Sequence, residues 1–368
     1  MFELTNAQRK CFGLLPVESN WTRIEPTPNP YDHHTTVAYL DGNIIRKFIR
    51  TGNDIYSEHE LCEQLSDDLR YLLPKTTRGK PMLLSASTLE ARTGFGMCLS
   101  YLRSDNDLSY IALYSIVSEN EYYSNNYEPL RTKGISDFQQ WVENWCQETS
   151  QEDFADIAAF AAQPRQHIKF REGDVFRFKI NRRLYGYGRI LLDYNLMRKR
   201  KIPFWDILMG KPLVCSVYHI ATTRDNVTLQ ELEHLDSLPS GHIMDNRFFY
   251  GQHKIIGNIP VSETEDYPIM YGHGGDFGQQ AVFLQCGKLY CKNPNKTALC
   301  DDFRNNGIGF KLSFELSVLQ KCMEARSNAP YWAQDNWSTN RDLRNPKFRD
   351  KLEQICCQFD LSPSHLIK

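Results

Sequence analysis

The stretch GDVFRFKINRRLYGYGRILLDY, residues 173–194, has the pattern of a β-hairpin and decides the fold of this chain. In its first half, apolar residues between Val175 and Ile180 stand among charged ones. The second half carries Gly186 and Gly188 inside an expected strand, where glycine normally weakens pairing. The two glycines predict a β-bulge or the close approach of another backbone. Strongly bent short strands favour a small barrel-like antiparallel domain, which we place at residues 166–290.

Sequence on the N-terminal side of this hairpin predicts a second β-rich domain, of α+β class, over residues 1–133. TTVAYLDGNIIRKFI (35–49) has two apolar runs around Asp41-Gly42, which is a strong hairpin signal. Apolar runs in GMCLSYL and SYIALYSIV read as further strands of one antiparallel sheet. A helix is expected near residues 57–72, because four leucines recur there at near-helical spacing. They are Leu61, Leu65, Leu69 and Leu72.

A helical linker is expected over residues 134–165. SDFQQWVENWCQ opens with Ser136 and has Gln139 three residues later, which is the arrangement of a capping box. Its apolar residues form one stripe: Phe138, Trp141, Val142, Trp145 and Cys146. A second helix, EDFADIAAFAAQ, is expected to stop at Pro164. We expect this helical pair to pack against both β-rich parts.

Residues 291–368 predict a C-terminal extension that is mostly helical. FELSVLQKCMEAR carries apolar residues on one side, and Pro346 is expected to begin a last helix. The apolar stripe of that helix is Phe348, Leu352, Ile355, Cys356 and Phe359. The whole chain is therefore expected to be a β-rich α+β protein.

Composition excludes several classes of protein. The chain has 368 residues, with 43 basic and 45 acidic side chains, so a globally basic nucleic-acid binder is not indicated. No apolar run approaches the length of about 18 residues that is needed to span a bilayer, and no signal peptide is recognisable. Eleven cysteines without a framework pattern fit a reducing cytoplasm. We expect a cytoplasmic protein with neither a membrane nor a nucleic acid as its partner.

Catalytic motifs are missing from the sequence. The GKP segments lack the earlier glycine of a phosphate-binding loop, and no G-x-S-x-G nucleophile elbow occurs. HELCE (59–63) has Glu63 where a zinc protease needs its second histidine. HGGD (273–276) has no matching nucleophile, and the cysteines have no CxxC spacing. We therefore expect no catalytic residue, no metal and no cofactor.

The hairpin and a later segment, HKIIGNIPVSETEDYP, together resemble the immunity protein 26 family of bacterial polymorphic toxin systems. The resemblance covers roughly residues 168–285 and departs from the family pattern in the insert RKRKIPFWDILMGKP and in the large flanking regions. The first signature consists of Gly173, Asp174, Phe176, Tyr185, Tyr187, Gly188 and Arg189. The second consists of Gly257, Asn258, Ile259 and Pro260.

This resemblance implies a cytoplasmic protein that binds a cognate toxin, encoded by a neighbouring gene, and neutralises it stoichiometrically without catalysis. The signature residues read as structural, with Phe176 and Ile190 facing the core. Partner contacts are expected in the insert, where the basic run RKRK occupies a predicted loop, and in the acidic loop SETED (262–266). The candidates are Arg198, Arg200, Phe204, Trp205, Glu263, Glu265 and Asp266. Trp205 is expected to be an exposed anchor.

Two other functions stay open at the level of sequence. One is a metal-dependent or histidine-based hydrolase that acts on nucleic acid or a small substrate. Its candidate residues are His219, His242, His253 and His273, with nearby acids. The other is a nucleic-acid binder that uses the barrel-like domain and the basic run, with a steeply salt-dependent affinity.

Overall fold

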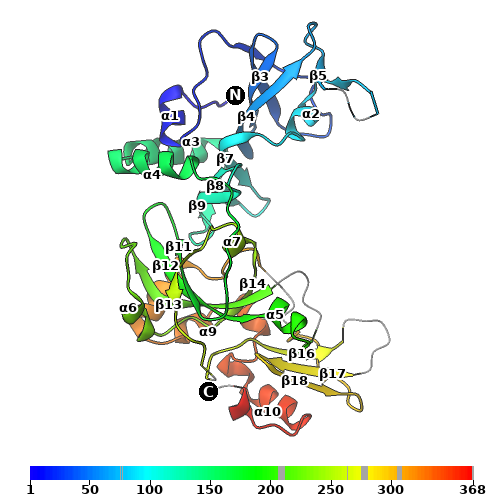
Figure 1. The fold of residues 1–368 in the computed structure, drawn as a ribbon, viewed down its shortest axis with the longest axis vertical. Coiled ribbons are helices and arrows are strands. Elements are labelled where there is room, and N and C mark those ends of the chain that lie inside the picture. Colours follow the sequence, from blue (N-terminus) through cyan, green and yellow to red (C-terminus); the bar gives the residue numbers. More distant parts are fainter. Residues whose placement is uncertain are drawn as a thin grey trace. The chain divides into compact units, whose positions relative to one another are not determined.

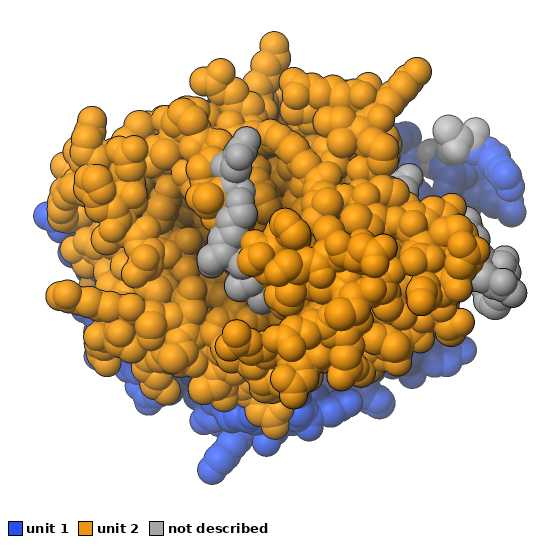
Figure 2. All heavy atoms as spheres, turned by 90° about the horizontal axis from the view of Figure 1, so that it is seen from below, with its two compact units in different colours: residues 1–166 blue, residues 167–368 orange. Residues whose placement is uncertain are grey.

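The computed structural model describes residues 1–74, 76, 78–205, 212–262, 264–274, 281–304 and 309–366. The chain forms two compact units, Met1–Gln166 and His167–Lys368 (Figure 1, Figure 2). This division differs from the expected one in two places. The helical pair that we expected as a linker lies in the first unit, and the C-terminal helices lie in the second.

The first unit is built on an antiparallel ten-stranded sheet, in which the main path runs β1-β2-β3-β4-β7-β8-β10. Its strands are β1 (Thr22–Ile24), β2 (Thr35–Asp41), β3 (Ile44–Thr51), β4 (Ile55–Leu65), β5 (Tyr71–Leu73), β6 (Met82–Leu83), β7 (Phe95–Arg103), β8 (Leu108–Ser115), β9 (Asn120–Ser124) and β10 (Leu130–Arg131). Its helices are α1 (Asn6–Cys11), α2 (Ala86–Glu90), α3 (Ile135–Gln147) and α4 (Gln151–Ala161). The hairpin predicted around Asp41-Gly42 is confirmed as β2 and β3.

The helix predicted near residues 57–72 is wrong, because most of that stretch is β4 followed by a turn and β5. A spacing of four residues places side chains on one face of a strand as well as on one face of a helix. Leu61 and Leu65 are therefore buried together in one cluster from a strand. Leu69 has a positive φ of 56° in the turn.

Helix α3 packs on the sheet through the predicted stripe, and α4 contributes Ile157 to the same cluster. Phe138, Val142 and Trp145 are buried in a cluster that also contains Leu99 of β7. The remaining stripe residues, Trp141 and Cys146, pack against the same cluster. The predicted capping box is wrong: α3 is capped at Gly134 without a side-chain hydrogen bond. The apolar face thus determines the helix, whereas the cap does not.

The second unit contains two antiparallel sheets. The five-stranded sheet has the order β14-β13-β12-β11-β15, and the three-stranded sheet has the order β16-β17-β18. Their bounds are β11 (Asp174–Lys179), β12 (Tyr185–Asp193), β13 (Pro212–Thr222), β14 (Gly241–Met244), β15 (Lys254–Asn258), β16 (Ile269–His273), β17 (Val282–Cys286) and β18 (Leu289–Asn293). Among the described strands, β14 and β15 are the two edges of the larger sheet, so the expected barrel-like domain is an open sheet.

The hairpin of residues 173–194 forms β11 and β12, and both predictions about its glycines are confirmed. The pairing of β12 with β13 shifts register between Gly186 and Gly188. A Cβ atom on Gly188 would overlap the carbonyl oxygen of Ser216 and the ring of Phe176. Phe176 is fully buried, as expected for a residue of the frame.

The C-terminal helices, which we expected to form a separate extension, pack into the core of the second unit. The predicted stripe of the last helix packs in one cluster with Ile269 and Tyr271 of β16. The helices are α5 (Tyr194–Lys199), α6 (Leu229–Glu233), α7 (Asn246–Phe249), α8 (Leu316–Ala325), α9 (Ala329–Trp332) and α10 (Arg349–Cys357), with 3₁₀ turns η1 (Thr339–Arg341), η2 (Pro346–Phe348) and η3 (Pro363–His365). In the part of the chain that the structure describes, no helix has the length and apolar character to cross a bilayer.

Candidate functional site

A pocket of about 670 Å³ lies in the second unit, and we call it the polar pocket. Residues of β12 and β13, the segment 233–237, the loop 259–266 and the turn between α8 and α9 line it. The side chains that give it its charge and polarity are Arg189, Tyr218, His219, Glu233, Asp236, Glu265, Asp266 and Asn328. These residues are far apart in sequence, so the tertiary fold alone assembles the pocket.

Arg189 and Glu265 form an ion pair in the wall of the polar pocket. Their side chains are only 14% and 12% exposed, so the pair is largely shielded from water. The other carboxylate oxygen of Glu265 accepts hydrogen bonds from Ser262, at 2.9 Å from the backbone nitrogen and 3.1 Å from Oγ. The pair therefore ties the segment after β15 to β12. The contacts of Glu265 lie within the protein, so its main role is structural rather than partner binding.

His219 is held in the pocket by hydrogen bonds to neighbouring segments. Its Nε2 lies 2.9 Å from Oδ1 of Asn328, and the Asn328 amide donates to the Ser237 carbonyl at 2.9 Å. The backbone nitrogen of His219 donates to the carbonyl of Asp236 at 2.8 Å. An amide oxygen can only accept, so Nε2 of His219 carries the proton here. Nε2 of His219 therefore donates a hydrogen bond to Asn328 and is not available to accept a proton from a substrate.

Asp266 joins the pocket to the buried guanidinium of Arg344. One oxygen of Asp266 accepts from Arg344 at 2.6 Å and from the Ser240 backbone at 3.0 Å. Burial lowers the pKa of Arg344, but the carboxylates of Asp266 and Asp342 more than offset this and raise it. The side chain of Asp266 remains 51% exposed, so its carboxylate also faces solvent.

The polar pocket has an excess of negative charge. Glu233 and Asp236 are exposed, and neither forms an ion pair with any residue that the structure describes. Burial raises the pKa of the Tyr218 phenol, with Arg189 opposing this, so that Tyr218 is a neutral hydrogen-bonding group at neutral pH. Carboxylates that are not neutralised attract a cation. The pocket therefore suits a basic side chain of a partner.

Of the residues predicted for partner contact, the pocket brings together Glu265 and Asp266. Glu263 lies outside the described residues. Arg198 and Arg200 are exposed at the end of α5, so the expected loop of the basic run begins as the last turn of a helix. The Arg198 guanidinium lies 5.6 Å from the centre of the half-buried Phe204 ring. None of the insert residues that the structure describes (198–205 and 212) lines the polar pocket.

The expectation that Trp205 is an exposed anchor is wrong. The side chain is 3% exposed, and its ring stacks on Phe283 with 5.4 Å between centroids. The backbone nitrogen of Trp205 donates to Oε1 of Gln285 at 3.0 Å. The apolar segment after the basic run packs in a cluster with residues of both sheets, such as Val214 and Met270. Burial of this large ring is favoured over its exposure.

The histidines of the hydrolase alternative do not share a site. Only His219 lines the polar pocket. His242 is buried on β14 with both ring nitrogens unpaired, and burial lowers its pKa to about 4. His253 is buried against Phe176, while His273 pairs with Asp301 at 3.2 Å. Among the described residues, none of these histidines belongs to a group able to hold a metal ion.

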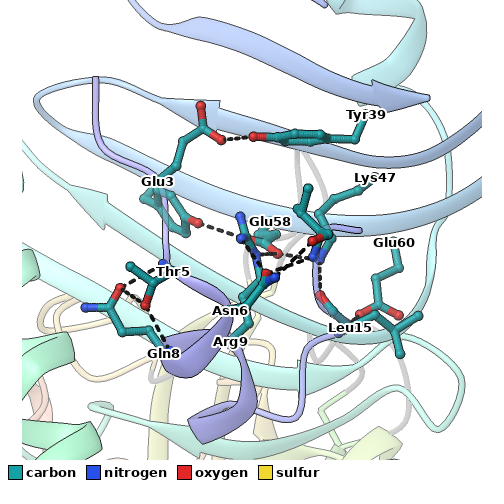
Figure 3. A network of polar contacts seen from close by, with 12 residues as sticks. Glu3, Thr5, Asn6, Gln8, Arg9, Leu15, Tyr39, Lys47, Glu58 and Glu60 are labelled. Atoms are coloured by element: carbon teal, nitrogen blue, oxygen red, sulfur yellow. Dashed lines mark hydrogen bonds and ion pairs between the residues drawn. The ribbon is translucent and has the colours of Figure 1, made fainter. Parts of the chain in front are cut away.

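A second concentration of charge lies in the core of the first unit (Figure 3). The carboxylate of Glu58 contacts Nζ of Lys47, Nε of Arg9 at 2.8 Å and the hydroxyl of Tyr56 at 2.8 Å. Lys47 also donates to the Leu15 carbonyl at 2.8 Å. Lys47 and Glu58 are fully buried, so a partner cannot reach them. This network fastens the N-terminal segment to β3 and β4, which is a structural role.

The second unit is thus a β-rich α+β domain that contains an acidic pocket. Within it, residues 171–279 match the family model of Immunity protein 26. The match covers under a third of the chain and confirms the resemblance for that segment. A toxin is therefore the general kind of partner to which this segment points. No curated protein and no solved structure among those compared matches the chain.

Several pocket residues have no signal in the sequence. Tyr218 and Asn328 belong to no motif. Arg189 stands in the family signature, where we took it as part of the frame, and its position beside the pocket gives it a second role. A charged residue in a half-buried strand is the signal that could have identified it, because such a residue needs a partner.

Proposed function

We propose that this protein is an immunity protein that binds a cognate toxin and neutralises it in a stoichiometric, non-catalytic complex, with the polar pocket as the contact site. The observation that carries this proposal is the overlap of the pocket with the family segment. All of the pocket's lining residues except Ser327 and Asn328 fall within residues 171–279.

Charge supports the pocket as a contact site. Glu233, Asp236 and Asp266 line a concave, solvent-accessible surface to which a lysine or arginine of a toxin can bind. Complementary charge accelerates association and selects the partner. The internal pairs Arg189–Glu265 and Arg344–Asp266 hold the surface in place before binding, which lowers the entropic cost of complex formation.

The basic end of α5 is a second proposed contact. Arg198 and Arg200 are exposed, and Phe204 lies half-buried beside Arg198. An exposed arginine next to an aromatic ring is a combination that is enriched at energetically important interface positions. Because these residues do not line the polar pocket, they are to be tested separately, with the double substitution Arg198→Ala and Arg200→Ala.

The test is co-purification and affinity titration against the product of the adjacent gene. We expect a tight one-to-one complex that abolishes the toxicity of that product. Replacing Glu233 by Gln and Asp236 by Asn together should weaken binding by about fivefold or more, because each removes an uncompensated charge. Most of the loss should be in the association rate and should shrink at high salt.

The matched control is Glu324→Gln, which removes an exposed carboxylate of α8 that is not among the residues lining the pocket. This variant should keep the affinity of the unmodified protein. Absence of binding to any toxin-like neighbour would argue against the immunity function. Tight binding that is unchanged both in the Glu233→Gln and Asp236→Asn double variant and in the Glu324→Gln control would keep the immunity function and reject the polar pocket as the contact site.

A further inference from the structure

Three side chains that can ligate a metal ion converge in the first unit, whereas the polar pocket belongs to the second unit. Asp32 and His34 precede β2, and Glu90 is the last residue of α2. One ligand atom from each residue lies within 4.8 Å of the other two. Nε2 of His34 faces both carboxylates, at 3.0 Å from Oε1 of Glu90 and 4.0 Å from Oδ2 of Asp32.

These distances fit a small divalent ion. Zinc bonds to histidine nitrogen and carboxylate oxygen at 2.0–2.2 Å, so two ligands of a tetrahedral ion are separated by roughly 3.4 Å. The distance of 3.0 Å from Nε2 of His34 to Glu90 is shorter than this value, and the distance of 4.0 Å to Asp32 is longer. Small side-chain rotations would bring both distances close to it. One imidazole and two carboxylates are a ligand set that zinc accepts, and they leave a fourth position for water.

Within the described part of the chain, no lysine or arginine forms an ion pair with Asp32 or Glu90. The only ion pairs of Asp32 and Glu90 within the described part of the chain are those with His34. The three side chains are 29%, 17% and 11% exposed, so two carboxylates share a partly shielded site with one imidazole. Such a site is costly without a cation, because like charges repel more strongly where water is partly excluded.

A neighbouring hydroxyl orients the cluster further. Oγ1 of Thr36 donates to Oε1 of Glu90 at 2.7 Å. Hydrogen bonds of this kind to a ligating carboxylate fix its direction and are typical of metal sites. We propose that Asp32, His34 and Glu90 bind one divalent transition-metal ion, with Zn²⁺ as the best match, in the first unit of this protein.

The experiment is calorimetric titration of the full chain with Zn²⁺ and optical titration with Co²⁺. Exposed thiols also bind zinc, so both titrations use a background in which the exposed Cys62 and Cys357 are replaced by Ser. We expect one ion per chain, and a Co²⁺ spectrum without the charge-transfer band of thiolate ligands. His34→Ala and Glu90→Gln should each lower the affinity by more than about tenfold.

The control is His33→Ala, because His33 is the exposed neighbour of His34 and is not part of the cluster. It should leave the affinity unchanged, and circular dichroism should show that all variants are folded. Asp32→Asn, at the most exposed ligand, repeats the test should His34→Ala not fold. Absence of binding, a thiolate band, or an equal loss in His33→Ala would each overturn the proposal and leave His34 and Glu90 as an ordinary ion pair.

Discussion

At the scale of single residues, a tight packing constraint in the second unit lies at Gly188. This glycine sits in β12 where the ring of Phe176 and the carbonyl of Ser216 both approach its backbone. Any side chain here must displace backbone, which a close-packed interior resists. The glycine of the family signature therefore has a packing explanation in this chain.

Gly188→Ala is expected to destabilise the protein by about 1–3 kcal/mol, because the added methyl group overpacks the sheet. Chemical denaturation monitored by tryptophan fluorescence measures the change. Gly241→Ala is the control, since a Cβ at Gly241 meets nothing within 4 Å and the residue has no positive φ. It should change the stability by less than about 0.5 kcal/mol. Equal stability of the two variants would contradict this account of Gly188.

Single residues also account for the stability of the buried charge network around Glu58 in the first unit. Burial alone would raise the pKa of Glu58, but Lys47 and Arg9 outweigh it and lower the pKa below its usual value. A carboxyl with a lowered folded-state pKa stabilises the protein above its unfolded-state pKa. That contribution is lost as the pH falls through the folded-state value. Acid should therefore weaken this network.

Glu58→Gln should destabilise the first unit by about 3–5 kcal/mol at neutral pH, because it leaves the buried Lys47 and Arg9 without their anion. The difference from the unmodified protein should shrink as the pH falls below the ordinary glutamate pKa of about 4.3, because the unfolded chain then binds a proton that the folded carboxyl resists. Urea denaturation at several pH values measures both effects. Glu143→Gln, at an exposed carboxylate of α3, is the control and should be nearly neutral. A constant difference across the acid range would show that the charge of Glu58 is not responsible.

At the scale of elements, the segment after α5 shows how apolar residues near a charged run are divided between surface and core. The basic residues stay in solvent, while Trp205 fills space between β13 of one sheet and β17 of the other. Both residues of the Phe204-Trp205 pair contact the same cluster, but only Trp205 is fully covered. The packing of two sheets thus decides which aromatic ring is available to a partner.

Trp205→Ala is expected to reduce the free energy of unfolding by about 3–5 kcal/mol, because it removes a buried ring and leaves a cavity. Thermal denaturation of the second unit measures it. Trp337→Ala provides a comparison at a tryptophan that is 50% exposed, where the loss should be below about 1 kcal/mol. A Trp205→Ala protein with unchanged stability but weakened toxin binding would restore the residue as an anchor.

At the scale of the whole molecule, the two units divide the proposed roles. Every described residue of the polar pocket belongs to the unit His167–Lys368, and the three metal ligands belong to Met1–Gln166. Each unit has its own buried clusters, which is the property of a part that can fold alone. Toxin binding and metal binding should therefore be separable.

A fragment of residues 167–368 is expected to bind the cognate toxin within about threefold of the affinity of the full chain, because the whole of the proposed contact site lies within one compact unit. Circular dichroism verifies folding, and calorimetry measures the affinity. A fragment of residues 1–166 should show no affinity for the toxin. A folded 167–368 fragment that loses more than about tenfold in affinity would assign part of the contact to the first unit.

The sequence by itself determined the elements that have a strong local pattern and the family of the central segment. The stripes of α3 and α10 and the strand content follow from periodicity, because an apolar side chain at a regular spacing must face a core. The bulge at the hairpin glycines follows from the presence of glycine inside a strand. Leu61 and Leu65 mark the limit of that reasoning, since a four-residue spacing serves a strand as well as a helix.

Only the tertiary structure decided where the candidate site lies. Arg189 meets Glu265, and His219 meets Asn328, because the order of strands and the return of the C-terminal helices bring separate segments together. Local pattern reports which face of an element is buried, but it carries no information about which distant element covers that face. For the same reason, neither the burial of Trp205 nor the convergence of Asp32, His34 and Glu90 could be predicted from local sequence.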